Sequence, residues 1–366
     1  MRLTEIRLNQ FRNLVQVRFC PQPGLNILGG ANAQGKTNLL EAVYVMSATT
    51  SFRGGKESNL INYQASRCTV AANYEKQDRS IECRLSLDRE KGKLFEINCK
   101  KAHRSHNDRL RVVLFTPDDL YLIKGSPARR REYLDFALSQ ISRPYAHELH
   151  NYQALLKRRN EMLRKGQGRS RVFEITDELY IKSAAEVALR RIKYVHRLQE
   201  TAAAIYARLT GGAEKLQLRY ALSFAVDSDT INLDVLREHM LRVAHEKRNQ
   251  EILRRSSLIG PHLDDLNIYA DAKLARLFAS QGQQRNLAVS LKLAELYSFA
   301  ALGGYYPLFL LDEVLAELDQ PRRNLLLGEL VQADYQTILT SVENIPDIAP
   351  DAARYEVKNG TITRKE

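Results

Sequence analysis

The sequence predicts an α/β fold made of two lobes, one of them assembled from the two ends of the chain. Strand-like patterns at both ends and helical periodicity between them support this, because each period is typical of one kind of element. We place the discontinuous α/β lobe at residues 1–115 and 300–366, and an inserted, mostly α-helical lobe at residues 116–299.

Alternating apolar residues predict strands in the first 110 residues. Apolar and polar residues alternate from Ile81 to Leu87, which is typical of a strand with one buried face. The turn-forming run Arg89–Gly92 then leads to a second apolar segment, Leu94–Ile97, so the pattern predicts a β-hairpin. Upstream, the apolar run Leu25–Leu28 ends in two glycines and precedes a helical pattern over Asn38–Tyr44. Strand, glycine loop and helix are therefore expected in that order.

Helical periodicity dominates the middle of the chain. Apolar residues recur every three or four positions from Leu134 to Leu156, and Pro144 is expected to break or kink that helix. The same spacing runs from Ile192 to Leu209, where Gly211–Gly212 signals a stop. Because residues 164–171 have the composition of a loop, we expect a helical arm folded back on itself.

The C-terminal part returns to strand-like sequence. Leu308–Leu311 and Thr337–Thr340 are short apolar runs, and an Asn359–Gly360 dipeptide between alternating residues predicts a hairpin turn. We expect these strands to join the N-terminal ones in a single lobe.

The charge balance favours a polyanionic partner. The chain of 366 residues carries 55 Lys and Arg against 43 Asp and Glu, a formal net charge of +12, within an ordinary globular composition. Residues 121–200 hold 17 of these basic residues and only 9 acidic ones. A solvated helical surface would explain any single cluster, but the regional excess favours a face that binds nucleic-acid phosphates.

Location can also be predicted from composition. No apolar run approaches the length of a membrane-spanning helix, and the N-terminus lacks the apolar core of a signal peptide. The four cysteines are widely spaced and contain no C-x-x-C pair, so we expect reduced thiols. These features predict a cytoplasmic protein with no membrane partner.

A phosphate-binding loop (P-loop) is predicted by the pattern G-x-x-x-x-G-K-[ST], which is met by Gly30, Ala31, Asn32, Ala33, Gln34, Gly35, Lys36 and Thr37. Glycines let backbone N–H groups curl around phosphate oxygens, and the helix that follows adds positive potential at its N-terminus. The pattern assigns Lys36 to the β- and γ-phosphates and Thr37 to Mg²⁺. A chance glycine-rich turn is the alternative, but here a predicted strand precedes the loop and a predicted helix follows it.

An acidic pair after an apolar strand supplies the second half of such a site. Asp312 would hold Mg²⁺, mainly through water, and Glu313 stands where a general base for the attacking water is needed. We take Lys36, Asp312 and Glu313 as the catalytic candidates. The acidic pair alone is a weak signal, because strands often end in an acidic residue. It becomes a strong one in combination with the P-loop, which lies upstream of the predicted helical lobe.

Ser280-Gln281-Gly282-Gln283-Gln284-Arg285 opens a helical pattern and resembles the signature motif of ABC-type ATPases. In that class a serine and a glycine backbone at a helix N-terminus hold the γ-phosphate of ATP bound to the P-loop of a partner. The resemblance implies that Ser280, Gly282 and Gln283 contact nucleotide in trans. Six residues alone fit an ordinary capped helix equally well, but Leu315–Asp319 also resembles the loop that follows the acidic pair in ABC ATPases, which adds Asp319 to the nucleotide contacts.

The whole chain resembles the RecF family of bacterial repair ATPases, relatives of SMC and Rad50 heads without the long coiled coil. The pieces that match, in order, are Phe11–Asn13, the P-loop with Asn32, Phe115–Leu120, Lys124–Pro127, Arg129–Asp135, Gly260–Asp265, Ser280–Arg285 and Asp312–Glu313. The resemblance implies an ABC-type, Rad50-head-like lobe, ATP and Mg²⁺ as cofactors, and a homodimer that closes on DNA. It also implies action at single-strand gaps with RecO and RecR to load RecA, and a contact of Arg12 with nucleotide phosphate.

Two departures from the ABC pattern predict slow hydrolysis. Asp118 and Asp119 stand where a glutamine is usual, and Thr340-Ser341 stands where many members have a switch histidine. A slow ATPase that times a clamp suits these residues. The alternatives are a transporter-energising subunit, which would bring a switch histidine and a shorter spacing, and an SMC-like structural head, which needs hundreds of heptad residues.

Overall fold

The computed structural model describes residues 1–103, 106–226, 230–342 and 351–365. The chain forms two compact units: unit 1 comprises residues 1–119 and 295–366, and unit 2 comprises residues 120–294. The boundaries predicted from the sequence lie at 115/116 and 299/300. Helix α8 (Gln281–Gly303) contains the second boundary, so its residues are divided between the two units.

Unit 1 contains two sheets. The antiparallel sheet has the strand order β2-β1-β4-β5-β6-β7, and its strands are β1 (Arg2–Phe11), β2 (Leu14–Phe19), β4 (Arg67–Lys76), β5 (Arg79–Asp88), β6 (Gly92–Ile97) and β7 (Lys100–Lys101). Strands β5 and β6 pair from Asp88 opposite Gly92 to Cys83 opposite Ile97, which confirms the predicted hairpin. The register leaves one side chain in two facing the core, as the alternation in the sequence requires.

The second sheet of unit 1 has the order β15-β14-β3-β13-β12-β8. Its strands are β3 (Leu25–Gly29), β8 (Val112–Phe115), β12 (Leu308–Asp312), β13 (Thr337–Ser341), β14 (Ala353–Lys358) and β15 (Thr361–Lys365). All pairs are parallel except β14–β15, which is the hairpin predicted from Asn359–Gly360. The two ends of the chain therefore share one sheet, and the carboxyl ends of β3, β12 and β13 meet at one edge.

Helix α1 (Lys36–Ala48) contacts strands of both sheets of unit 1. Most of its residues are buried, and they join one apolar core with inward residues of β1, β4, β5, β12 and β14. A helix that is apolar nearly all round is expected between two layers. Unit 1 also contains helix α9 (Gln320–Val331) and the 3-10 turns η1 (Glu57–Leu60) and η3 (Val314–Glu317), while η2 (Pro117–Leu120) lies at the first boundary.

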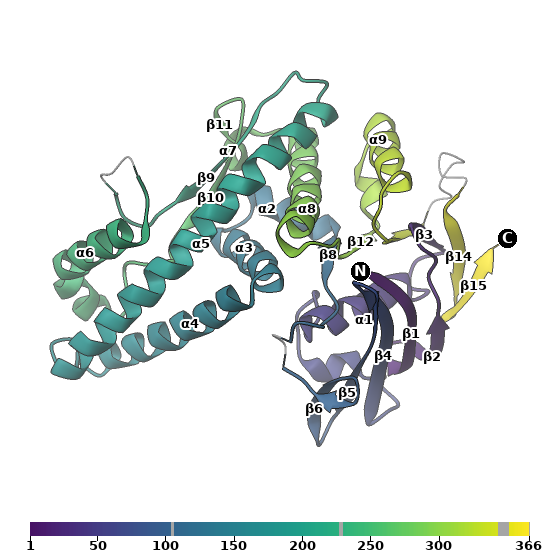
Figure 1. Ribbon diagram of the computed structural model, residues 1–366, viewed down its shortest axis with the longest axis horizontal. Helices are drawn as coiled ribbons and strands as arrows, with labels where there is room; N and C mark the ends of the chain where they lie inside the picture. The colour runs from purple at the N-terminus through teal and green to yellow at the C-terminus, as the bar shows by residue number, and fades with distance from the viewer. Residues whose placement is uncertain (104–105, 227–229, 343–350, 366) are drawn as a thin grey trace. The chain divides into compact units, whose positions relative to one another are not determined.

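Unit 2 is mainly helical (Figure 1). It contains α2 (Tyr121–Lys124), α3 (Pro127–Ile141), α4 (Arg143–Arg164), α5 (Arg171–Leu209), α6 (Leu233–Arg254), α7 (Ala275–Phe278) and the first part of α8. Helix α3 ends just before Pro144, which occupies the first turn of α4, so the predicted break is confirmed. A three-stranded sheet of β9 (Leu216–Ala221), β10 (Asp265–Ala270) and β11 (Lys273–Leu274), which the helical periodicity did not indicate, completes the unit.

Three arginines of unit 2 are buried in ion pairs. Arg130 makes two bonds to Asp265, at 2.7 and 2.9 Å, and Arg191 makes two to Asp135, both 2.8 Å. Arg159, fully buried, bonds Asp177 on α5 and Glu251 on α6, the closest contact being 2.6 Å. These cations hold segments together that are 18 to 135 residues apart in sequence. They are therefore unavailable to an external polyanion, and removing one partner would leave a buried charge uncompensated.

Within the described residues, no helix is long and apolar enough to cross a membrane.

Candidate nucleotide-binding site

The P-loop joins the end of β3 to the start of α1, the context predicted from the sequence. Gly30 has a φ of 145°, and a Cβ there would lie 2.4 Å from the carbonyl oxygen of Val357. Gly35 has a φ of 113°, and a Cβ there would lie 2.8 Å from the side chain of Leu14. Only glycine fits either position. Because α1 begins without a side-chain cap or an acidic residue in its first turn, its N-terminal N–H groups remain available to an anion.

The C-terminal hairpin supports this loop from a distant part of the sequence. The N–H of Asn359 donates to Oε1 of Gln34 at 2.7 Å, and the N–H of Gly360 donates to the Gln34 carbonyl at 3.1 Å. Both turn residues have positive φ, as an Asn-Gly turn requires. The loop is therefore held at Gln34 by the hairpin turn and at Gly30 by close packing against β14.

Lys36 points back into the curve of the loop. Its Nζ donates to the carbonyl oxygens of Gly30 at 2.8 Å and Ala31 at 2.9 Å, and lies 3.4 Å from a carboxylate oxygen of Glu313. The Lys36 side chain is only 3% exposed. The ammonium group is thus already placed inside a ring of backbone atoms, where an incoming phosphate could replace the carbonyls as its partner.

Thr37, Asp312 and Thr340 form the centre of the acidic part of the site. The hydroxyls of Thr37 and Thr340 both donate to Oδ1 of Asp312, at 2.8 and 2.9 Å. Burial raises the pKa of Asp312 above its usual value, and the two hydroxyl donors oppose that rise. The chain thus brings together a hydroxyl and a carboxylate 275 residues apart, an all-oxygen donor set that suits Mg²⁺.

Glu313 follows directly and is more accessible. Its backbone has a φ of 54°, in the left-handed region that is uncommon for residues other than glycine, and its N–H donates to the Thr340 hydroxyl at 3.0 Å. The side chain is 37% exposed. Thr340 therefore binds both acidic residues at once, a role that its place in the sequence, where many ABC ATPases have a histidine, does not indicate.

Replacing Asp312 with Asn should raise the thermal stability of the nucleotide-free protein while removing any Mg²⁺-dependent stabilisation by nucleotide. The Asn Oδ1 can still accept both threonine hydroxyls, and the substitution removes a buried charge. Because burial raises the pKa of Asp312 in the folded state, its ionisation opposes folding, and wild-type stability falls as pH rises through that pKa. The advantage of Asp312→Asn should therefore appear at neutral pH and vanish below about pH 4. Differential scanning fluorimetry across this pH range measures it, and an equal gain at all pH values would contradict the assignment.

Arg12 lies beside α1 at a residue of positive φ, in the turn between β1 and β2. Its guanidinium makes two bonds to the buried carboxylate of Glu41, at 2.9 and 2.7 Å. The Arg12 side chain remains 22% exposed. Arg53, in the segment after α1, bonds the amide oxygen of Asn38 at 2.9 Å and lies 3.8 Å from Glu41. Two cations therefore meet near the first turns of α1, and only Arg12 was expected from the sequence.

The signature-like segment lies in unit 2, at the N-terminus of α8. The Gln283 N–H donates to Oγ of Ser280 at 3.2 Å, and the Ser280 N–H donates to Oε1 of Gln283 at 2.8 Å. A Cβ on Gly282 would have no atom within 4 Å. In unit 1, Asp319 caps α9 by accepting from the Arg322 N–H at 3.2 Å. Helix capping therefore accounts for Ser280, Gln283 and Asp319. Within the described residues, no contact requires a glycine at position 282.

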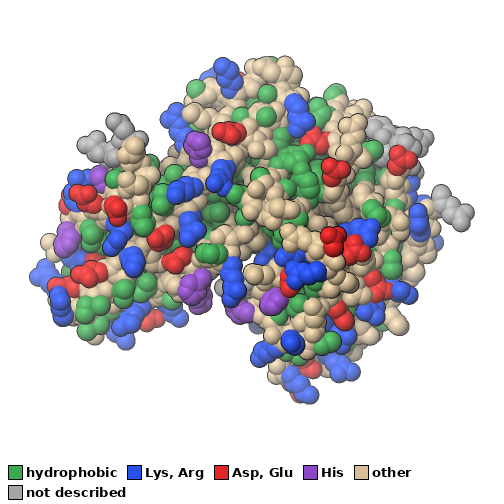
Figure 2. Space-filling model, viewed as in Figure 1, with side chains coloured by type: hydrophobic (Ala, Val, Ile, Leu, Met, Phe, Trp, Pro, Cys, Tyr) green, Lys and Arg blue, Asp and Glu red, His purple; other side chains and the backbone are tan. Residues whose placement is uncertain are grey.

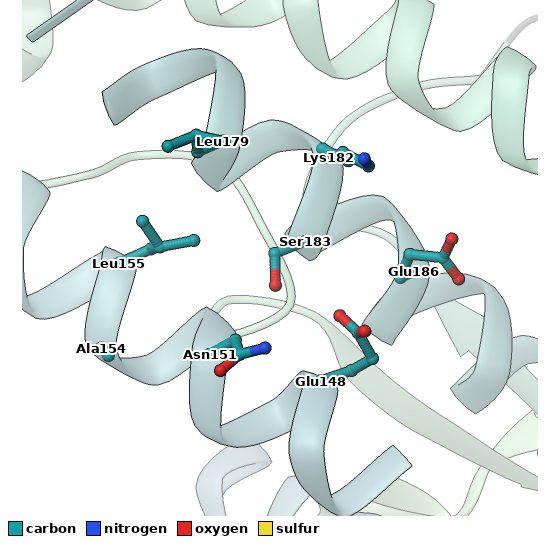
Figure 3. A pocket seen from close by; sticks show the side chains of 8 residues that line it. All are labelled: Glu148, Asn151, Ala154, Leu155, Leu179, Lys182, Ser183 and Glu186. Carbon is teal, nitrogen blue, oxygen red and sulfur yellow. The ribbon is translucent and has the colours of Figure 1, made fainter. Parts of the chain in front are cut away.

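An open groove of about 400 Å³ lies on unit 2 between α4 and α5 (Figure 3). Leu155 and Leu179 line one end of it, and the carboxylates of Glu148 and Glu186 lie together at the other. Asn151, Lys182 and Ser183 also line the groove, which therefore carries two carboxylates against one cation. This charge balance disfavours phosphate, and neither nucleotide nor the DNA backbone is expected in this groove.

The sequence is similar to known proteins over nearly its whole length. The sequence matches the RecF/RecN/SMC N-terminal domain family over residues 2–348. Two proteins named DNA replication and repair protein RecF, from Bacillus mycoides (strain KBAB4) and Bacillus cereus (strain G9842), are each 36% identical to it, over 99% of this chain and 98% of theirs.

Solved structures give the same family and extend the likeness of fold. A structure of the recombination mediator protein RecF with ATP, of the RecFOR pathway, has a TM-score of 0.89 and 28% identity, covering 100% of this chain and 98% of that one. An Smc head bound to the C-winged helix domain of ScpA has a TM-score of 0.57 and 17% identity, covering 100% and 97%. This second match shows a shared ABC-type head fold alone.

Proposed function

Because this chain belongs to the RecF family, with the α/β fold of an ABC-type ATPase head, we propose that it is an ATP-binding protein of DNA replication and repair. In this proposal two copies pair when ATP is bound, grip DNA through basic arms, and separate after slow hydrolysis. By family resemblance the DNA has a single-strand gap or junction, RecO and RecR are the protein partners, and loading of RecA is the outcome.

The meeting of Lys36, Thr37, Asp312 and Glu313 at one sheet edge is the observation that carries this proposal. Bound Mg²⁺ would neutralise charge on the ATP phosphates and orient them. Thr37 and Asp312 would hold that ion, Asp312 through water, and Lys36 would give up its loop carbonyls for phosphate oxygens. Glu313 would take the proton of the attacking water, since it is the exposed carboxylate beside Lys36.

Slow turnover fits the arrangement around Thr340. The hydroxyl that binds Asp312 and the Glu313 N–H fixes both acids, but a threonine supplies no charge for a developing oxyanion, as a histidine could. Asp119 is used locally, since its carboxylate accepts from the Thr116 N–H at 2.7 Å. We therefore propose an ATPase whose hydrolysis acts as a release switch.

We propose that the DNA-binding face is formed by exposed cations near the C-terminal end of α4 and the N-terminal end of α5. Lys157, Arg158, Arg164, Lys165 and Arg169 are all exposed, unlike the three buried arginines of the same unit. Figure 2 shows basic side chains over these helices interspersed with acidic ones, without a continuous basic patch on the visible face. In this proposal the separate cations contact individual phosphates of the DNA backbone, which gives little sequence preference.

Pairing through the signature segment can be tested with two variants that should both weaken dimerisation without harming the single chain. Ser280→Arg should leave ATP binding to one copy intact but abolish ATP-dependent dimerisation, because a long cation would occupy the place of the partner's phosphate. Gly282→Ala should stabilise the single chain by about 0.5–1 kcal/mol, since a helical glycine with free space gains from a methyl group. The same methyl group should weaken dimerisation, because it blocks close approach of a phosphate to the backbone.

Light scattering coupled to size-exclusion chromatography measures the molecular mass of the wild type and of both variants with ATP, with ADP and without nucleotide. Dimers seen only with ATP in the wild type, and lost in Ser280→Arg, are expected. Equal dimerisation by Ser280→Arg would refute the trans arrangement.

A further inference from the structure

The N-terminal turn of α8 is held by contacts that reach outside the helix. Ser280 and Gln283 form a capping box, each accepting a backbone N–H from the other. The Gln283 amide has a second contact, because its Nε2 donates to Oε1 of Glu214 at 3.0 Å. The oxygen and the nitrogen of the Gln283 side-chain amide therefore both form hydrogen bonds within unit 2.

Glu214 is itself held by a residue of helix α5. It lies in the segment between α5 and β9, and its second carboxylate oxygen accepts a hydrogen bond from the hydroxyl of Tyr206. Tyr206 is fully buried in the last turns of α5. Three side chains, Tyr206, Glu214 and Gln283, thus connect the last turns of α5 to the first turn of α8.

We infer that Glu214 is a positioning residue for the nucleotide site in trans, an inference that rests on the proposed function. Gln283 can cap Ser280 only in one rotamer, and the hydrogen bond to Glu214 selects that rotamer. Without it, the Ser280 N–H would lose its acceptor and the first turn would fray, because helix ends depend on such caps. The Ser280 hydroxyl and the N–H groups around Gly282 would then no longer be pre-arranged for a partner's phosphate.

A hydrogen-bond acceptor is what this role requires. The Glu214 carboxylate is a favourable charge near a helix N-terminus, yet it is also a like charge to an approaching phosphate. Glutamine keeps one acceptor oxygen for the Gln283 amide and removes the charge, while its NH2 group can donate to the Tyr206 hydroxyl in place of the second carboxylate oxygen. The geometry therefore predicts that Glu214→Gln works and Glu214→Ala does not.

Four variants test this: Glu214→Ala, Glu214→Gln, Tyr206→Phe, and Glu200→Ala as the matched control. Glu200 is an exposed glutamate on α5, so its removal makes the same change of charge without touching α8. The dimer dissociation constant is measured by sedimentation with ATP and Mg²⁺. The affinity of the single chain for a fluorescent ATP analogue and the melting temperature are measured in parallel.

We expect Glu214→Ala to weaken dimerisation by up to about tenfold, the upper range for loss of one hydrogen bond, with nucleotide affinity of the single chain unchanged. Tyr206→Phe should fall between it and the wild type, and Glu214→Gln and Glu200→Ala should match the wild type. Wild-type dimerisation by Glu214→Ala, or a parallel fall in single-chain nucleotide affinity, would overturn the inference, as would a defect in Glu214→Gln equal to that of Glu214→Ala. If the wild type itself did not dimerise with ATP, the proposed function would be contradicted, and the inference would be lost with it.

Discussion

Glu313→Gln is expected to lower ATP turnover by about 100-fold or more, the usual contribution of a positioned general base. Nucleotide binding should be nearly unchanged, because the Glu313 side chain is partly exposed and its replacement leaves Lys36 and the P-loop in place. The backbone of Glu313 stays in place, since its N–H bond to Thr340 does not involve the side chain. The ATP-bound dimer should therefore last longer than that of the wild type.

Steady-state phosphate release and the lifetime of the dimer after ATP is removed measure these two effects. Glu90→Gln is the control, since Glu90 is an exposed carboxylate of unit 1 in the turn between β5 and β6. Wild-type turnover by Glu313→Gln would show that another group takes the proton.

Lys36→Met should weaken ATP binding by about 10- to 100-fold, the loss expected for charge-assisted hydrogen bonds. Methionine matches the length of the buried lysine stem, so the fold should survive. The loop itself is also held by Gln34 and by the packing of Gly30, neither of which involves Lys36. Nucleotide affinity should therefore fall without a comparable loss of stability.

Titration with a fluorescent ATP analogue and a melting curve separate these two quantities. Lys56→Met, at an exposed lysine just before η1, is the matched control. A drop in melting temperature of Lys36→Met without nucleotide, together with unchanged affinity, would mean that Lys36 serves the loop alone.

Local patterns in the sequence were sufficient to predict much of unit 1. The hairpin after β5, the strands β12 and β13, and the Asn359–Gly360 turn follow from alternation and turn residues, which act over a few positions. Lys36 and Thr37 could be named because the P-loop is a contiguous motif. Asp312 could be named only in combination with it, since many strands end in an acidic residue.

Contacts between distant residues were missed, because no local pattern encodes them. Thr340 was noted as a missing histidine, but its hydroxyl turns out to join Asp312 to the backbone of Glu313. Glu41, inside an apolar helix, gave no sign that it would pair with Arg12. The charge excess of residues 121–200 includes Arg159, which is buried between two acidic residues, so composition overstates the number of cations on the surface.

The central claim is that ATP controls the grip on DNA, and fluorescence anisotropy on a gapped duplex tests it most directly. Binding is measured with ATP, ADP and no nucleotide over a series of salt concentrations. The account predicts tight binding with ATP alone and an affinity that falls steeply with salt, as release of counterions from several phosphates requires. Equal affinity in all three nucleotide states would contradict it, because the ATP site and the basic arm would then work independently.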